Sequence, residues 1–202
     1  MGPRGGALIP PVLRTPRLRL RPFARADAPA VQRLAGARLI ADTTRQIPHP
    51  YADGMAEAWI ASHASLHDED RALTLAVETR EEHRLCGAVG LRLAREDRHA
   101  ELGYWIGVSD WGRGLCTEAA AAVVDYGFEV LGLHRIFATY FARNPASGRV
   151  LEKLGMAIEG CLRQHVRKWG VFEDLLVRGI VRDEWLARKT GPARAPTHRS
   201  AG

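Results

Sequence analysis

The chain has 202 residues, of which 46% are hydrophobic and 26% charged, and it carries a formal net charge of +6. These proportions are typical of an ordinary globular domain, and the length predicts one domain. No apolar run approaches the roughly 20 residues that a bilayer-spanning helix needs. Residues 1–16 also lack the apolar centre of a secretory signal. We therefore expect a cytoplasmic protein without a membrane partner.

The cysteines and histidines do not form a metal-binding pattern. Cys86, Cys116 and Cys161 are widely spaced, and the eight histidines are scattered along the chain. An odd number of cysteines without a Cys-x-x-Cys pair argues against both a disulfide framework and a zinc site. We therefore expect no bound metal.

The positive charge is concentrated at the two ends of the chain. Residues 1–16 carry two arginines and no acid, and residues 188–202 carry four basic residues and no acid. The remaining 23 basic residues balance the 23 acidic ones. We therefore expect a flexible leader over residues 1–16, a single domain over residues 17–187 and a basic flexible tail over residues 188–202. Nucleic acid is not expected as the principal ligand, although RNA binding through the tails stays an alternative.

The first half of the chain predicts one strand, two helices and three further strands. Leu18 and Leu20 alternate with arginines at a period of two, which is typical of a strand with one polar face. Asp27 suits the cap of the first helix, and two prolines make residues 43–51 a loop. The expected bounds are 17–22 for the first strand, 27–35 and 53–66 for the helices, and 73–79, 86–94 and 100–108 for the later strands.

The second half predicts a helix, a strand, a helix and a closing hairpin. Apolar side chains recur at steps of three and four through an alanine-rich segment that Gly132 ends. Asn144 suits the cap of the next helix, Pro145 its first position and Gly155 its exit. The expected bounds are 115–131 and 145–154 for the helices, and 135–142, 157–167 and 171–181 for the strands.

This order of elements predicts a mixed α/β (α+β) fold with a sheet that is largely antiparallel at its beginning. Strand leads into helix at residues 108–115 and again at residues 142–147. Open sheets of this class bind ligands at such passages. In the first passage, Gly112 and Gly114 let the backbone approach a ligand closely, and the start of the following helix presents N–H groups with partial positive charge. The passage therefore predicts an anion site, although a tight connection without a ligand explains a lone glycine pair equally well.

Several segments together resemble the GNAT superfamily of acetyl-CoA-dependent N-acetyltransferases. The branch that they resemble is the RimJ/RimL type, which acetylates ribosomal-protein N-termini. The family motif Q/R-x-x-G-x-G/A maps onto residues 111–116, with Trp111 and Cys116 as departures from it. The matching segments are RLRLR at 17–21, ELGYWI at 101–106, WGRGLCTEA at 111–119, NPAS at 144–147, LEKLG at 151–155 and EGCLR at 159–163.

The resemblance implies a mostly antiparallel central sheet flanked by helices, with two splayed strands at the acetyl-CoA site. It implies that backbone N–H groups from Gly112 to Thr117 hold the cofactor diphosphate, and that backbone groups at the end of the 100–108 strand bind pantetheine and polarise the thioester carbonyl. Asn144 is implied to contact the pantetheine arm. The implied cofactor-binding residues are Ile106, Val108, Trp111, Gly112, Arg113, Gly114, Leu115, Cys116, Thr117, Asn144 and Ser147.

The same resemblance implies two catalytic side chains. Ser147 is the candidate acid that protonates the leaving thiolate, although helix capping by itself explains a serine there. Glu101 is the candidate base that takes a proton from the incoming ammonium, although a carboxylate on a solvated strand face is the plainer explanation. Glu78 is the reserve base, and Cys116 leaves a covalent route open.

The acceptor is the least defined part of the prediction. A protein or peptide N-terminal amine is the first hypothesis; a small amine such as an antibiotic, amino acid or polyamine, and a non-catalytic CoA-binding module, are the alternatives. An acceptor pocket lined by Trp59, Trp105, Trp169 and Phe172 is weighed against ordinary core packing of these aromatic residues. The 43–51 loop is a candidate lip of that pocket. Homodimerisation through the closing hairpin or the second helix is one more arrangement that the sequence allows.

Overall fold

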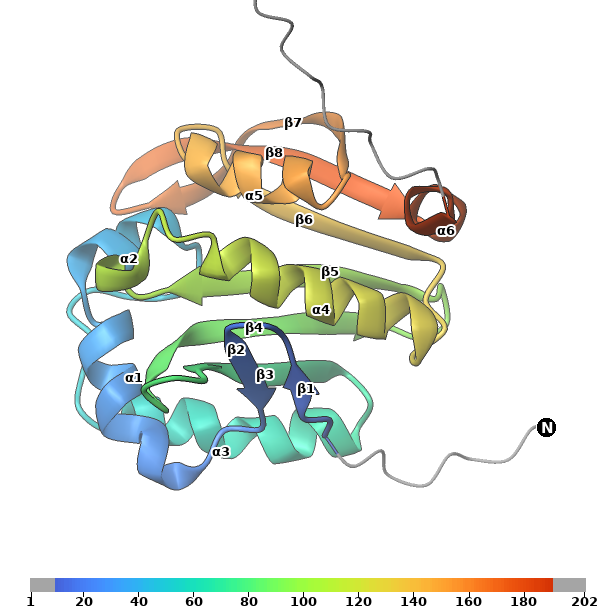
Figure 1. The fold of residues 1–202 in the computed structure, drawn as a ribbon. Coiled ribbons are helices and arrows are strands. Elements are labelled where there is room, and N and C mark those ends of the chain that lie inside the picture. The colour runs from blue at the N-terminus through green and yellow to red at the C-terminus, as the bar shows by residue number, and fades with distance from the viewer. Residues whose placement is uncertain (1–9, 191–202) are drawn as a thin grey trace, which may run out of the picture.

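The computed structural model describes residues 10–190 and contains one mixed sheet with helices on both faces (Figure 1). The eight strands lie in the order β1-β2-β3-β4-β5-β6-β8-β7. The strands are β1 Leu13–Arg14, β2 Leu18–Arg21, β3 Ala72–Thr79, β4 Leu85–Ala94, β5 His99–Ile106, β6 Arg135–Phe141, β7 Ala157–Lys168 and β8 Val171–Val181. The helices are α1 Ala28–Ala35, α2 Arg38–Thr43, α3 Met55–Asp68, α4 Leu115–Glu129, α5 Pro145–Lys153 and α6 Arg182–Thr190, with short 3-10 turns at Arg25–Asp27 and Val108–Asp110.

The sheet is antiparallel throughout except between β5 and β6, which run parallel. The connection from β5 to β6 passes through α4, as a crossover between parallel strands requires. The expected mixed, mostly antiparallel fold is therefore confirmed.

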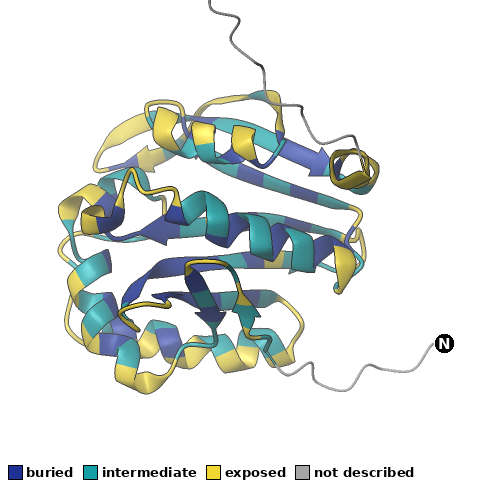
Figure 2. Ribbon diagram, in the orientation of Figure 1, coloured by how far each residue is buried: buried dark blue, intermediate teal, exposed yellow. Residues whose placement is uncertain are grey.

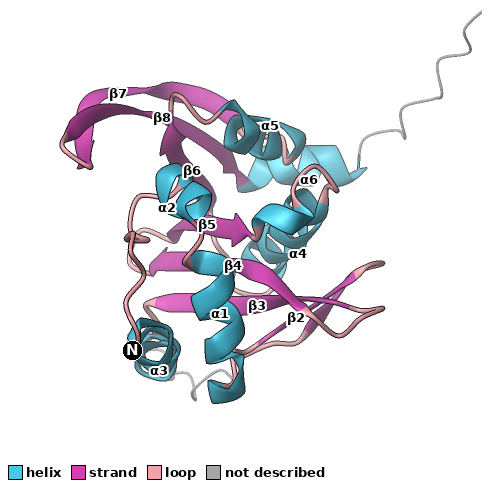
Figure 3. Ribbon diagram, turned by 90° about the vertical axis from the view of Figure 1, so that its left-hand side faces the viewer, coloured by secondary structure: helices cyan, strands magenta, loops and turns pink. Residues whose placement is uncertain are grey.

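Two hydrophobic cores lie on the two faces of the sheet. One packs α4, α5 and α6 against the sheet and contains Val123, Phe128 and Ile136. The other packs α1 and α3 against the opposite face and contains Val31, Ile60 and Trp105. Figure 3 shows the helices separated in this way by the sheet. Side chains alternate between the two faces of a strand, so consecutive residues of β5 point to different cores.

Three short elements escaped the sequence analysis. The six-residue α2 has no side-chain cap, and its two buried residues give too little periodicity to predict it. Only Trp185 is buried in the otherwise polar α6, where it stacks on Phe128 with a ring separation of 5.1 Å. β1 has two residues and is defined by its pairing with β2.

Both of the expected domain boundaries move outward in the structure. β1 lies within the expected leader, and α6 extends three residues into the expected tail. Lys189 of that extension is an ion-pair partner of Asp125, with a separation of 2.7 Å. Residues 1–9 and 191–202, the rest of the expected leader and tail, lie outside the described residues.

Candidate functional site

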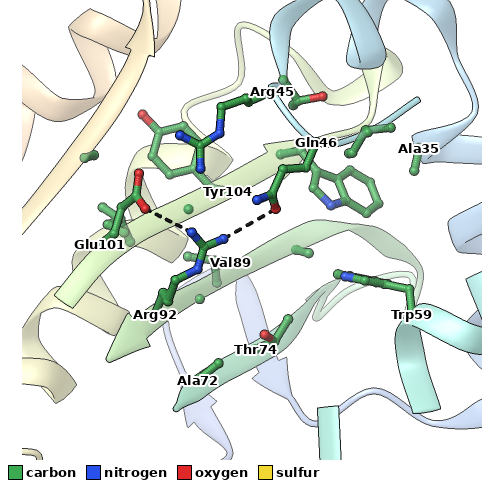
Figure 4. Close-up of a pocket in the computed structure, with 18 of the residues that line it drawn as sticks. Ala35, Arg45, Gln46, Trp59, Ala72, Thr74, Val89, Arg92, Glu101 and Tyr104 are labelled. Atoms are coloured by element: carbon green, nitrogen blue, oxygen red, sulfur yellow. Dashed lines mark hydrogen bonds and ion pairs between the residues drawn. The ribbon is translucent and has the colours of Figure 1, made fainter. Parts of the chain in front are cut away.

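A cavity of about 540 Å³ crosses the middle of the sheet (Figure 4). Its floor is made by β4 and β5, its sides by α3 and β6, and its rim by the 44–54 loop that connects α2 to α3, which we call the lip loop. Ser147 of α5 contributes to the lining from beyond β6. The cavity therefore has access to both faces of the sheet.

The opening between the two faces arises because β5 and β6 part. The two strands pair only over His99–Glu101 and Arg135–Phe137, although β5 continues to Ile106 and β6 to Phe141. Figure 1 shows them lying together at one end and diverging toward the other. The described structure thus contains the splayed strand pair that the resemblance implied.

The divergence directs the backbone of Ile106 toward the opening. The Gly107 N–H donates to the Cys86 carbonyl of β4 at 2.8 Å. Backbone groups alternate in direction along a strand, so the N–H of Ile106 points away from β4, toward β6. The Ile106 carbonyl accepts from the Trp111 indole at 2.6 Å. Val108 lies beyond the strand, in the 3-10 turn Val108–Asp110, because β5 ends two residues earlier than expected.

The glycine turn, residues 111–117, connects β5 to α4. Gly112 and Gly114 have φ of 74° and 75°, the left-handed region that glycine adopts without strain. Gly114 occupies the cap position of α4, and a glycine has no side chain with which to bond to the N–H groups of that helix end. A Cβ at Gly112 would meet nothing within 4 Å. The turn therefore presents open backbone amides, which fit an anion such as a diphosphate.

Buried and half-buried ion pairs hold this turn in place. Arg84 donates to both carboxylate oxygens of Asp110, at 2.7 and 2.9 Å, and Arg113 donates to one of them at 2.9 Å. Hydrogen bonds from Arg84 hold the pKa of Asp110 below its usual value, against the opposing effect of burial. Glu118 in the first turn of α4 accepts from Arg17 at 2.6 Å.

Tyr104 and Ser147 meet on the α4 side of the sheet. The Tyr104 hydroxyl lies 2.9 Å from Ser147 Oγ and 3.2 Å from the Ser147 carbonyl oxygen. Burial raises the pKa of Tyr104, so this phenol stays protonated and can donate a hydrogen bond. Asn144 caps α5 by accepting from the Ser147 N–H at 3.2 Å, which fixes the position of the serine. The expected cap is confirmed.

Cys116 lies at the start of α4, close enough to Tyr104 to influence its ionisation. Burial raises the pKa of the Cys116 thiol to about 12. Thiolate, not thiol, is the nucleophilic form of cysteine, so a thiol of this kind is a poor nucleophile at neutral pH. The geometry thus favours direct transfer over a covalent route through Cys116.

Glu101 lies on the opposite face of β5 from Tyr104, inside the cavity. Thr139 of β6 donates to one of its carboxylate oxygens at 2.8 Å, and Arg92 of β4 lies 3.3 Å from the other. Arg92 also donates to Gln46 of the lip loop at 3.4 Å (Figure 4). The carboxylate is 23% exposed, so it can exchange a proton with a bound amine or with water.

Glu78, the reserve base, is not among the residues that line the cavity. Its buried carboxylate accepts from Arg21 at 2.7 Å and from Arg19 at 3.4 Å. Burial alone would raise its pKa, but hydrogen bonds and charges of the two arginines lower it overall. A carboxylate held in this way stabilises the β2–β3 pairing and is a poor base.

The lip loop is held over the cavity by groups from distant parts of the chain. Lys168 at the end of β7 donates to the Ile47 carbonyl at 2.8 Å and to the Arg45 carbonyl at 3.5 Å. Asn144 donates to the Thr43 carbonyl at 3.5 Å, next to the start of the loop. The loop contributes lining residues from Thr44 onward, so the expected acceptor lip borders the cavity.

The four aromatic residues considered for an acceptor pocket divide into two pairs. Trp59 and Trp105 line the cavity. Trp169 and Phe172 do not; they lie at the turn of the β7–β8 hairpin, 47% and 61% exposed. Figure 2 shows how much of this hairpin is exposed. Neither alternative therefore holds for this second pair, since the two side chains neither line the cavity nor pack in a core.

Sequence reasoning missed several polar residues of the cavity. Tyr104 stood in a matching segment without an assigned role, and Thr139, Gln46 and Arg45 gave no local signal. Arg92 could have been predicted as a neighbour of Glu101. The two residues pair directly in the expected hairpin once the turn between its strands is placed. Cross-strand neighbours of this kind can be predicted, whereas neighbours from a loop or a parallel strand cannot.

Neither a membrane span nor a metal cluster is found among residues 10–190. No helix in this part of the chain is both long and apolar enough to cross a bilayer. No group of three or more histidine, cysteine, aspartate or glutamate side chains is arranged to hold a metal ion in the same part.

Comparisons with known proteins give consistent matches. A family model described as an acetyltransferase (GNAT) domain matches residues 17–157. The uncharacterised N-acetyltransferase YoaA of Bacillus subtilis strain 168 is 36% identical over 175 residues, which are 85% of this chain and 97% of that protein. The ribosomal protein uS5-alanine N-acetyltransferase of Escherichia coli strain K12 is 27% identical over 146 residues, 71% of this chain and 75% of that protein.

A solved structure agrees with these sequence matches. The RimJ protein of Mycobacterium smegmatis, in complex with CoA-disulfide, superposes with a TM-score of 0.75 and 26% sequence identity. The superposition covers 83% of each chain. The same fold is therefore found in a chain of similar sequence.

Proposed function

Because the chain belongs to the GNAT family of acetyltransferases and is an acetyl-CoA-dependent N-acetyltransferase, we propose that it acetylates the N-terminal amine of a protein or peptide. The single observation that carries the acceptor is the cavity, which places Glu101 beside the splay and is bordered by the lip loop. The match to the uS5-alanine enzyme supports the same choice.

Acetyl-CoA supplies the activated acetyl group as a thioester. The open amides of the glycine turn from Gly112 to Thr117 bind the diphosphate, as the partial positive charge at the start of α4 favours. The splay between β5 and β6 admits the pantetheine arm, and Asn144 and Ser147 border its end. This arrangement positions the thioester at the cavity.

The two proton transfers, to Glu101 and from Ser147, occur on opposite faces of β5. On the α3 side, Glu101 takes a proton from the acceptor ammonium, directly or through water, and so frees the nitrogen lone pair for attack on the acetyl carbonyl carbon. The N–H of Ile106 donates to the carbonyl oxygen as negative charge develops there. The carbon–sulfur bond then breaks, and the thiolate takes a proton from Ser147, which Tyr104 supports through its 2.9 Å hydrogen bond. The second proton, which the nitrogen loses as the amide forms, passes through water to the Ser147–Tyr104 pair and replaces the one given to sulfur.

The charges that line the cavity argue against a polyamine as the acceptor. Glu101 is the one carboxylate among the described residues that line it, and Arg45 and Arg92 are two cations. A substrate with several ammonium groups is repelled by such a site. Other small amines stay as the alternative acceptor class, because GNAT scaffolds serve several acceptors.

An acceptor-panel assay tests the proposal. Purified protein is mixed with acetyl-CoA and either short peptides with free N-termini or small amines, and free CoA and the acetylated product are measured. We expect peptide acetylation that Glu101→Gln and Ser147→Ala reduce at least tenfold without weakening acetyl-CoA binding, as loss of one proton-transfer group should. Cys161→Ser, an exposed residue outside the cavity, is the control. Acetylation of small amines with no peptide reacting would contradict the N-terminal acceptor, and binding without any turnover would indicate a non-catalytic module.

We also propose that residues 13–190 form the whole catalytic domain, since β1 and α6 pack onto the sheet. A cytoplasmic location and homodimerisation stay predictions.

A further inference from the structure

The cavity carries more positive than negative charge, which is unfavourable for a site that accepts an ammonium ion. Among the described lining residues, Glu101 is the carboxylate, and Arg45 and Arg92 are the guanidinium groups. One negative and two positive charges leave an excess of one positive charge. An incoming amine binds as a cation before it loses its proton, so this excess opposes binding unless the acceptor brings a negative charge of its own.

Arg45 has no counter-ion among the described residues. Its side chain makes no hydrogen bond or ion pair within residues 10–190, where the neighbouring arginines Arg92 and Arg143 each bind a carboxylate. Figure 4 shows the Arg45 guanidinium extending from the lip loop toward the space next to Tyr104 and Glu101. A guanidinium offers five N–H donors in a planar fork that matches a carboxylate, so an unpartnered one at a cavity rim is a ready anion site.

Arg92 lies on the same side of the cavity as Arg45 and can also bind a carboxylate. Its contacts with Glu101 and Gln46, at 3.3 and 3.4 Å, are both at the long end of the hydrogen-bond range. The Gln46 amide is a neutral partner that a carboxylate can replace with a gain in electrostatic energy. Arg45 and Arg92 thus face one space from the lip loop and from β4.

The position of Arg45 is set by the fold. Lys168, which is 8% exposed, donates to the backbone carbonyls of Arg45 and Ile47 and so holds this part of the lip loop against the end of β7. The ammonium group of Lys168 adds further positive charge behind the loop. The backbone that carries Arg45 is therefore restrained, which lowers the entropy that its side chain loses when it binds an anion.

We propose that the acceptor carries a carboxylate a few bonds from its reactive amine, and that Arg45 and Arg92 bind this carboxylate while Glu101 receives the ammonium. The proposal rests on the proposed function, since it defines the acceptor of the same site. For a peptide, the carboxylate belongs to an aspartate or glutamate side chain at the first or second position. A free amino acid offers the same chemistry through its own α-carboxylate, and the test distinguishes the two sources.

The test compares peptides that differ only at the second residue. Peptides beginning Ala-Asp, Ala-Asn and Ala-Lys are acetylated by the full chain, and kcat/KM is measured for each at low salt. We expect Ala-Asp to exceed Ala-Asn by about tenfold and Ala-Lys by more, the size expected for one half-exposed ion pair with a second, weaker one. The preference should fall as ionic strength rises.

Variants of Arg45 assign the preference to this residue. Arg45→Gln should reduce the Asp-over-Asn ratio to less than threefold, Arg45→Lys should keep most of it, and Arg45→Glu should favour Ala-Lys. Arg33→Gln removes the same charge from an exposed residue of α1 that does not line the cavity, and it should leave the ratio unchanged.

The outcomes separate this inference from the proposed function. Peptide acetylation at equal rates for Asp, Asn and Lys overturns the carboxylate selectivity and leaves the N-terminal acceptor standing. Acetylation of alanine but of neither alaninamide nor any peptide supports the carboxylate site and overturns the peptide acceptor. Turnover confined to amines without a carboxylate overturns both.

Discussion

The phenol oxygen of Tyr104 lies 2.9 Å from Oγ of Ser147, although 43 positions separate the two residues in the chain. Tyr104 belongs to β5, which borders the splay, and Ser147 belongs to α5, the helix that follows β6 on the other side of it. A protonated phenol at this distance can orient the serine hydroxyl and restore its proton. We therefore predict that the pair works as one proton-donating unit at the end of the expected pantetheine channel.

The first prediction concerns this pair. Ser147→Ala should lower kcat by at least tenfold, with little change in the KM for acetyl-CoA, because the hydroxyl acts mainly as charge develops on sulfur. Tyr104→Phe keeps the ring and removes its hydrogen bond, so it should lower kcat by a smaller factor. The double variant should be no slower than Ser147→Ala, since each change removes the same unit. Steady-state kinetics checks all three, and multiplying losses would contradict a shared role.

The second prediction concerns the glycine turn. Gly112→Ala should weaken acetyl-CoA binding strongly, because a Cβ there projects into open space that the diphosphate needs. It should also cost about 1 kcal/mol of stability, since φ of 74° disfavours alanine. Gly132→Ala is the matched control, as its φ is 64° and a Cβ there likewise meets nothing within 4 Å. Calorimetric titration and thermal unfolding of the two variants should show equal destabilisation and a binding defect in Gly112→Ala alone.

The third prediction concerns the lip loop. Lys168→Met removes the ammonium that donates to the carbonyls of Arg45 and Ile47, so both carbonyls must be hydrated by water instead. We expect the KM for the acceptor to rise several-fold while the KM for acetyl-CoA stays within twofold, because the hydrogen bonds of Lys168 go to the lip loop and not to the glycine turn. Lys153→Met on α5, whose side chain does not line the cavity, is the control. An equal rise in both KM values would show that Lys168 supports the whole site instead.

The fourth prediction concerns pH and the buried carboxylate of Asp110. Its pKa in the folded protein lies below the usual 3.8, chiefly because Arg84 hydrogen-bonds to it. A lowered pKa contributes stability that is present above about pH 3.8 and is lost as the pH falls through the folded value. Asp110→Asn should therefore cost about 2 kcal/mol at pH 7, as loss of charge-assisted hydrogen bonds does.

This cost should shrink as the pH falls below about 4, where the wild-type carboxyl loses its own charge. Urea unfolding of both proteins between pH 3 and 7 measures the difference. Asp97→Asn, at an exposed position between β4 and β5, is the control and should change stability by less than about 0.5 kcal/mol at every pH. A pH-independent difference between Asp110→Asn and wild type would show that the asparagine fails for steric reasons.

Most secondary structure could be predicted because its signals are local. The alternation of Leu18 and Leu20 with arginines, the Asn144 cap and the glycines that end helices all act within a few residues of the chain. The elements that were missed have weak local signals. Trp185, for example, holds α6 through contacts with Asp125 and Phe128, which lie more than fifty residues away.

The same distinction between local and long-range contacts applies to the residues of the candidate site. The glycine turn and the Asn144 cap were predicted because backbone conformation and capping depend on adjacent residues. Glu78 and Glu101 looked alike as carboxylates on strands, and only the structure shows that one is neutralised by Arg19 and Arg21 while the other enters the cavity. The difference depends on which strands are neighbours and on their register, neither of which spacing along the chain defines.

The sequence by itself therefore determined the order of most elements, the glycine turn and the family to which they point, because short-range sterics and hydrogen bonding govern each of these. Only the tertiary structure decided which side chains share the cavity. The parting of β5 and β6, the Tyr104–Ser147 pair and the convergence of Arg45 with Arg92 all join residues from separate elements. Such contacts depend on how the sheet and loops pack in space.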